Sequence, residues 1–373
     1  MKILHTSDLH LGKNLSEESF YEDQKHILDE ILKIVIEQKV KVVMIPGDIY
    51  DKSIPSSEAS MLFDSFLTRL SKLGVKTLIT SGNHDSNERL SFGSKIFDEF
   101  NIHIVTKYNG EIDKIYIDDV CFYMLPFLKP FHIKHLTTEK EYENINNSND
   151  MIKWILDREN IDKTKKNILL CHQFVMWNSK LPEQCDSESI SLNNVGTIDA
   201  IDANLLDDFD YVALGHIHRG QKIKRDTIRY SGTPLKYSFS EANDHKSVVL
   251  FDTDNLSIEL IELTPLRDLK ILRGTFEEVM NMKTTNDIIK VELVDENTII
   301  SPMEELKKRF PNAIALTFIN KAETISNLNS EIKEEATPYE LFECFFEEQN
   351  GRKLNIDEDN YLKKVIESLE GGE

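Results

Sequence analysis

The sequence predicts an α/β fold whose first half is organised around a largely parallel sheet. Apolar, β-rich runs at residues 2–7, 40–45 and 76–80 each have the length of a buried strand. Two segments with helical periodicity, at about 17–38 and 56–73, separate these runs. Strand and helix therefore alternate, which is typical of βαβ units with parallel strands.

After residue 110 the alternation becomes less regular. The runs at 112–117 and 120–125 predict a hairpin, and residues 139–158 predict a helix around an Asn-rich stretch. Further apolar strands, and short strands that indicate a second sheet, follow at residues 167–171, 211–214 and 221–263.

A second pattern of strands and helices begins near residue 267 and predicts a small, separate α+β domain. Its expected elements are strands at 269–272, 288–294 and 313–318 and helices at 276–282 and 302–310. Polar and acidic residues then predict a linker. Apolar stripes at helical spacing predict two helical segments beyond it, at 338–348 and about 357–369. The expected domains are therefore 1–265, 267–320, a linker at 321–337 and a helical segment at 338–373.

The composition restricts how this chain can act. The net charge of −21 argues against a protein that grips DNA through a broad basic surface of its own. A polyanionic substrate would require metal ions or a partner to supply positive charge. The four cysteines show no paired spacing, no run reaches the roughly 18 apolar residues of a membrane span, and Ser7-Asp8 follows the N-terminus too closely for a signal peptide. We therefore expect a cytoplasmic protein.

Polar donors follow directly after five of the predicted strands. They are Asp8, His10, Asp48, Asn83, His172, His216 and His218. Oxygen and nitrogen donors without cysteine suit Mn²⁺, Mg²⁺ or Fe²⁺, with Zn²⁺ as an alternative. Seven donors are too many for one tetrahedral site and suit two octahedral ions completed by water and substrate oxygens. Asp48, alone at its strand end, could bridge the two ions.

Each cluster by itself has an ordinary explanation, since Gly-Asn and Gly-Asp are common turn sequences. Their joint occurrence after consecutive strands favours a two-metal centre, and such centres catalyse phosphoester hydrolysis. His84 adjoins Asn83 and is placed to donate a proton to the leaving oxygen. Asp85 could orient His84 through its ring N–H.

The order of these motifs resembles that of the calcineurin-like metallophosphoesterase superfamily over residues 1–220. The stretches 6–12, 47–51 and 214–218 resemble the branch of DNA double-strand-break nucleases. Residues 230–241 and 246–248 are similar to the bacterial SbcD branch in particular.

The resemblance implies a two-sheet sandwich flanked by helices, a small α+β DNA-capping domain at 267–320 and C-terminal partner-binding helices. It implies His84 as the catalytic histidine, and Mn²⁺ as the usual ion. It also implies one metal held by Asp8, His10, Asp48 and His218, and another held by Asp48, Asn83, His172 and His216. Arg219, Lys236 and Tyr237 are candidate DNA contacts, although Tyr237 fits a core position equally well.

The family partner is an SbcC-type coiled-coil ATPase, in a two-plus-two assembly that contains a homodimer. Such complexes degrade duplex ends in the 3′→5′ direction and cut single strands and hairpins, in DNA repair, replication and recombination. Two alternatives remain at this stage. A small-molecule or nucleotide phosphodiesterase on the same core would not need the C-terminal domains, and a scaffold for an ATPase would not need the complete ligand set.

Overall fold

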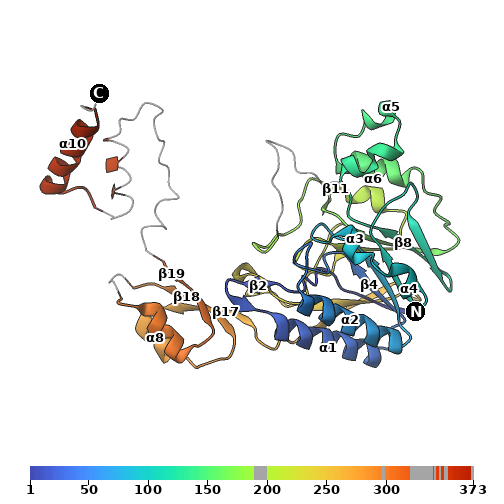
Figure 1. Ribbon diagram of the computed structural model, residues 1–373, viewed down its shortest axis with the longest axis horizontal. Helices are drawn as coiled ribbons and strands as arrows, with labels where there is room; N and C mark the ends of the chain where they lie inside the picture. Colours follow the sequence, from blue (N-terminus) through green and yellow to red (C-terminus); the bar gives the residue numbers. More distant parts are fainter. Residues whose placement is uncertain are drawn as a thin grey trace. The chain divides into compact units, whose positions relative to one another are not determined.

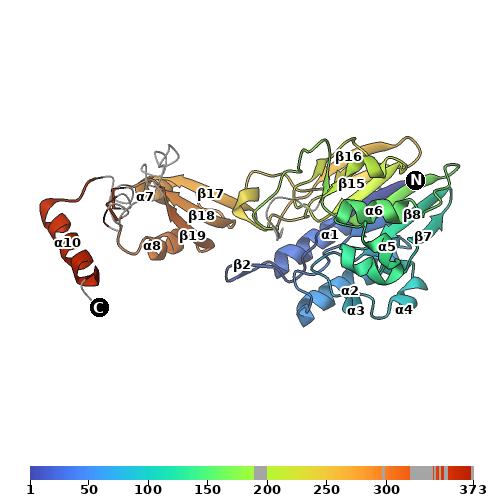
Figure 2. The same cartoon turned by 90° about the horizontal axis from the view of Figure 1, so that it is seen from above.

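The structure, a computed structural model, divides the chain into two compact units, Met1–Lys270 and Ile271–Glu373 (Figures 1 and 2). It describes residues 1–188, 200–295, 299–319, 339, 342–343, 346–347 and 352–370.

The first unit contains a six-stranded sheet in the order β16-β15-β1-β4-β5-β6. Strands β1, β4, β5 and β6 are parallel to one another, whereas β15 is antiparallel to β1 and β16 is antiparallel to β15. The strands are β1 (Lys2–His5), β4 (Val42–Pro46), β5 (Lys76–Thr80), β6 (Ile102–Val105), β15 (Ser247–Asp252) and β16 (Ser257–Glu262).

A second six-stranded sheet has the order β13-β14-β12-β9-β8-β7. Its four central strands are parallel, and the edge strands β7 and β13 are antiparallel to their neighbours. The strands are β7 (Asp113–Ile117), β8 (Val120–Leu125), β9 (Lys166–His172), β12 (Tyr211–Gly215), β13 (Gln221–Lys222) and β14 (Ile228–Tyr230).

The two sheets pack face to face around a shared apolar core. Side chains of the first sheet such as Met44 and Phe251 belong to the same buried cluster as Phe122 and Tyr211 of the second. Helices α1 (Tyr21–Glu37) and α2 (Ser57–Lys72) pack against each other outside the first sheet, and α6 (Ser148–Leu156) packs on the outer cluster of the second (Figure 2). The predicted two-sheet sandwich with flanking helices is therefore confirmed.

Two local predictions differ from the structure. The short strands of residues 221–263 indicate a second sheet, but only β13 and β14 join that sheet, whereas β15 and β16 join the first. Alternating apolar residues identify a strand but do not identify its partner, which for β15 is β1, 246 residues away at the Leu4–Leu250 pair. The helix expected at 139–158 is divided into α5 (Glu139–Tyr142) and α6, because Asn147 caps a new helix.

The remaining elements of the first unit are short. They are β2 (Asn14–Leu15), β3 (Glu18–Ser19), α3 (Asn87–Leu90), α4 (Ser94–Asp98), η1 (Pro130–Leu136), β10 (Val175–Met176), β11 (Ile201–Asp202), η2 (Ala203–Leu206) and η3 (Phe239–Glu241).

The second unit contains a three-stranded sheet with its own core. The sheet has the order β17-β18-β19, and Val279, Val291, Leu306 and Phe310 are among its fully buried side chains. Its elements are β17 (Leu269–Gly274), α7 (Phe276–Asn281), β18 (Ile288–Leu293), α8 (Pro302–Arg309), β19 (Ala313–Phe318) and the separate helix α10 (Ile356–Glu370). The expected linker at 321–337 lies outside the described residues, as does most of the expected helix at 338–348. Among the helices that the structure describes, none combines the length and apolar character of a membrane span.

Candidate metal centre

The carboxyl ends of strands from both sheets meet at one place. Loops after β1, β4 and β5 carry Asp8, Asp48 and Asn83, while β9 ends in His172 and β12 is followed by His216. In open α/β sheets this end of parallel strands is where ligands bind. The backbone there is unusual, since positive φ angles occur at Asp8 (53°), His10 (44°), Asp48 (52°) and His216 (105°). Such conformations cost about 1–3 kcal/mol each and cluster at functional sites.

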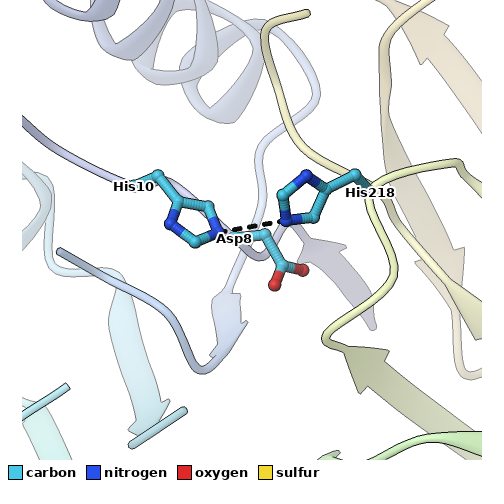
Figure 3. A group of neighbouring side chains, drawn as sticks. All are labelled: Asp8, His10 and His218. Atoms are coloured by element: carbon cyan, nitrogen blue, oxygen red, sulfur yellow. Dashed lines mark hydrogen bonds between the residues drawn. The ribbon is translucent and has the colours of Figure 1, made fainter. Parts of the chain in front are cut away.

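His10, His218 and Asp8 form one part of the centre (Figure 3). Nε2 of His10 lies 3.1 Å from Nε2 of His218, and all three side chains are buried. Nδ1 of His10 is a buried polar atom without a hydrogen-bond partner in the described part of the chain. Two imidazole nitrogens directed at one point beside a carboxylate are a donor set for a divalent ion.

Asp48 lies between this group and the remaining donors. Its Oδ2 is 3.6 Å from Nε2 of His10 and 3.3 Å from Nε2 of His172, and its Oδ1 accepts the backbone N–H of His84 at 2.9 Å. Gly82 leaves room for this carboxylate, because a Cβ at residue 82 would lie 2.1 Å from Asp48 Oδ1.

Asn83 completes the far side of the centre. Its Oδ1 is 3.0 Å from Nε2 of His172 and 2.9 Å from Nδ1 of His216. His172 donates Nδ1–H to the carbonyl oxygen of Pro46 at 2.9 Å, which directs its Nε2 into the centre. The structure thus brings together all seven donors that the sequence singled out.

The electrostatics of the centre call for added positive charge. Burial, together with the neighbouring Asp48, raises the pKa of Asp8 to about 7. Burial would lower the pKa of His172, but Asp48 and Asp8 outweigh it and raise that pKa to about 9. Burial lowers the pKa of His10 and of His216 to about 3, so these rings are neutral near pH 7 and can offer lone pairs. Crowded buried carboxylates beside the neutral imidazoles of His10 and His216 fit divalent cations.

His218 is held in place by a chain of hydrogen bonds, a role that the sequence did not predict for the residues involved. Its Nδ1 lies 2.7 Å from Oγ of Ser187, and that hydroxyl donates to Oε1 of Glu241 at 2.6 Å. Glu241 is fully buried and pairs with Lys246 at 2.6 Å. Because the hydroxyl hydrogen goes to Glu241, Oγ accepts from Nδ1–H of His218, which leaves Nε2 as the ring's lone-pair nitrogen. Ser187 lies outside every motif that the sequence singled out, whereas Glu241 and Lys246 lie in the stretches 230–241 and 246–248, which marked them without indicating this role.

The contacts of Asp85 differ from the expected ones. Its carboxylate accepts the backbone N–H groups of Gly82 at 2.9 Å, Tyr50 at 3.1 Å and Ile49 at 3.2 Å. Nδ1 of His84 instead lies 2.8 Å from the carbonyl oxygen of Asp51. Asp85 therefore ties the loop after β5 to the loop after β4, and the backbone of Asp51 orients the His84 ring. Burial, followed by the nearby Asp48, raises the pKa of Asp85 to about 6.

The three candidate DNA contacts all have partners inside the protein. Tyr237 is 2% exposed, donates its hydroxyl to the carbonyl oxygen of Leu9, and occupies the core position that the sequence left open. Lys236 Nζ pairs with Asp268 at 2.9 Å. The guanidinium of Arg219 forms ion pairs with an acid on either side, Asp244 at 3.0 Å and Glu183 at 3.1 Å.

Comparison with known proteins defines the class to which this site belongs. Residues 1–220 match the family described as calcineurin-like phosphoesterase, and residues 265–350 match a family described as type 5 capsule protein repressor C-terminal domain. Because the first match spans more than half of the sequence, the chain belongs to the calcineurin-like phosphoesterase family and is a metal-dependent phosphodiesterase.

Within that family, the chain falls in the branch of a named relative. It is 31% identical over 382 residues to the D subunit of the nuclease SbcCD of Staphylococcus epidermidis (strain ATCC 12228 / FDA PCI 1200), with 100% of both chains covered. Among solved structures, a dimetal phosphatase from Danio rerio is 12% identical, covering 70% of this chain and 96% of its own, with a TM-score of 0.38. A Thermus thermophilus protein is also 12% identical, covering 70% and 98%, with a TM-score of 0.39. Scores this low add nothing to the family assignment.

Proposed function

We propose that the chain is a two-metal DNA nuclease that works as one subunit of a larger complex. The observation that carries the proposal is the convergence of seven oxygen and nitrogen donors from both sheets around the buried carboxylate of Asp48. Further support comes from the full-length relative, which is named as a nuclease subunit.

The donors divide into two sets that share one residue. Asp8, His10 and His218 would hold one ion with Asp48, and Asn83, His172 and His216 would hold the other with Asp48. Mn²⁺ is the ion we expect. Bound there, two ions supply a clamp for the phosphoryl oxygens and lower the pKa of a coordinated water.

His84 acts beside these donors on the leaving group. Its ring centroid lies 4.9 Å from that of His10, and its backbone N–H is held by Asp48. The carbonyl oxygen of Asp51 can only accept a hydrogen bond, so Nδ1 of His84 carries a hydrogen and Nε2 is the atom that gains and releases a proton. This side chain would donate that proton to the leaving oxygen.

The specific nuclease activities that we propose are those of the SbcD-like branch. We propose 3′→5′ exonuclease activity on duplex ends and endonuclease activity on single strands and hairpins, in cytoplasmic DNA repair, replication and recombination. The partner would be an SbcC-type coiled-coil ATPase that contributes much of the DNA grip, in agreement with the net charge of −21 of this chain. A homodimer within a two-plus-two complex is consistent with the exposed Met61 (71%), Phe92 (84%) and Ile96 (63%).

The domains 1–265 and 267–320 would carry the nuclease centre and a DNA cap, and the linker 321–337 would lead to partner-binding helices in 338–373. Deleting residues 331–373 should abolish co-purification with the ATPase and leave Mn²⁺-dependent cleavage of single strands. Normal capture of the ATPase by the truncated chain would show that the partner binds elsewhere.

One comparison of substrates tests the nuclease assignment. The full chain with Mn²⁺ should cleave hairpin and single-stranded DNA as well as bis(p-nitrophenyl) phosphate, and His84→Ala should lose both activities. Cleavage of the small ester alone, with DNA intact even when the ATPase is present, would instead identify a small-molecule or nucleotide phosphodiesterase.

A further inference from the structure

The segment that follows β8 begins at Phe127, which contacts a histidine of the metal centre. The ring of Phe127 lies 6.3 Å from that of His216 at an interplanar angle of 27°. Its backbone N–H donates to the carbonyl oxygen of Ser81 at 2.9 Å, and the carbonyl oxygen of Leu128 accepts from Nε2 of Gln173 at 3.0 Å. These contacts fix the start of the segment to the loop that carries Asn83 and to the strand end that carries His172.

From there the chain runs outward and presents cations and an aromatic ring to solvent. Residues 127–136, which we term the β8 exit segment, include the 3₁₀ helix η1, and this helix is anchored by the fully buried Ile133. Around that anchor Lys129 and Lys134 are exposed, and Phe131 is 61% exposed. The buried Ile133 thus fixes the position of the exposed lysines and of the exposed phenylalanine ring.

The charge of this segment contrasts with that of the chain. No Asp or Glu occurs between residues 120 and 138, although the chain as a whole carries a net charge of −21. Among the described residues, Lys129 and Lys134 form no ion pair with a carboxylate, and the Lys134 ammonium lies 5.3 Å from the centre of the Tyr142 ring. Burial and the neighbouring Lys129 lower the pKa of His132, so the lysines supply the positive charge near neutral pH.

The distances along the chain place these cations close to the centre. Lys129 is two residues beyond Phe127, so their Cα atoms are at most about 7 Å apart. A nucleic-acid strand carries one phosphate about every 3.4 Å along a duplex axis. Lys129 can therefore reach phosphates within about one to four nucleotides of a phosphodiester held at the metal centre. Lys134 lies five residues further along the same segment.

We propose that the β8 exit segment is a contact surface for the nucleic-acid strand being cleaved, with Lys129 and Lys134 on backbone phosphates and Phe131 stacked on a base. Such cations, interleaved with an exposed aromatic ring, suit sequence-independent binding of single-stranded nucleic acid. The assignment rests on the proposed nuclease function and adds the surface that selects a polymeric substrate over a small ester.

The test compares two substrates in the full chain with Mn²⁺. Lys129→Ala/Lys134→Ala should lower kcat/KM for a single-stranded oligonucleotide, and should leave kcat/KM for bis(p-nitrophenyl) phosphate unchanged. The slope of log kcat/KM for the oligonucleotide against log salt should fall by about 0.7 for each lost phosphate contact. Phe131→Ala should reduce the oligonucleotide value by about five- to a hundredfold with little change in that slope.

Matched variants make the outcome decisive. Lys129→Arg/Lys134→Arg keeps both charges and should retain the wild-type ratio of the two activities. Lys33→Ala/Lys41→Ala removes two exposed charges away from the ligand-bearing strand ends and should also retain it. An unchanged ratio in Lys129→Ala/Lys134→Ala, or an equal loss on both substrates, would overturn the proposal. A wild-type chain that cleaves the ester but no DNA would overturn the proposed function itself.

Discussion

The two sheets hold their parts of the metal centre in different ways. The loops of the first sheet carry both carboxylates and the amide. Hydrogen bonds from backbone N–H groups to carboxylates hold these loops, since Asp85 accepts three N–H groups and Asp48 accepts that of His84. The second sheet contributes only imidazoles, and His218 depends on the side chains of Ser187 and Glu241. A hydrogen bond from a side chain to the backbone depends on one side chain, whereas a hydrogen bond between two side chains depends on both. Substitutions on the two sides should therefore have different consequences.

The largest effect is expected at Asp48, where the two donor sets meet. Asp48→Ala should lose both metals and all turnover, because one carboxylate faces His10 and His172 together. Metal content per chain after gel filtration is the measurement, with the wild type as reference. Retention of one full equivalent would contradict a bridging role.

The next largest effect separates two neighbours in the first-sheet loop. His84→Ala should keep its metals and reduce turnover by about 10²–10⁴-fold, the usual contribution of a general acid. Asn83→Ala should mainly weaken metal binding, since its Oδ1 faces His172 and His216. Titration calorimetry with Mn²⁺ beside steady-state kinetics distinguishes the two variants. Equal metal loss in both would place His84 among the ligands.

A smaller effect tests how tightly the first-sheet loops are packed. Gly82→Ala places a Cβ 2.1 Å from Asp48 Oδ1, so it should lower the free energy of unfolding by about 1–3 kcal/mol and lower metal affinity. Gly74→Ala is the matched control, because nothing lies within 4 Å of its added Cβ and only its positive φ of 70° is strained. Urea denaturation of both variants gives the comparison. Equal destabilisation of the two variants would show that the loop after β5 can accommodate the added methyl group by a small shift.

The smallest effect probes the second-sheet side. Ser187→Ala should lower Mn²⁺ affinity by about 10–100-fold, the usual effect of losing an outer hydrogen bond to a ligating histidine. It should do so without changing the free energy of unfolding of the metal-free chain by more than about 1 kcal/mol. Ser187→Thr keeps the hydroxyl and should restore affinity. If Ser187→Ala binds Mn²⁺ as the wild type does, Ser187 does not position His218.

Most ligands of the metal centre could be predicted from the sequence, because the pattern that marks them is local. Each ligand lies at or shortly after the end of an apolar run, and a strand end can be recognised without knowing which strands pair. The supporting residues had no such signal, because Ser187 and Glu241 meet His218 only through the folding of distant loops. The same reason explains Asp85, whose adjacency to His84 suggested a ring contact that the backbone of Asp51 makes instead.

By itself, then, the sequence determined the α/β class, the positions of the ligand-bearing strand ends and the seven donors. Only the tertiary structure decided that β15 and β16 complete the first sheet, that Tyr237 belongs to the core, and that Lys129, Phe131 and Lys134 are exposed. The physical reason is that periodicity records which face of an element is apolar, whereas strand pairing, burial of a single ring and the neighbours of a lysine depend on contacts between segments far apart in the chain.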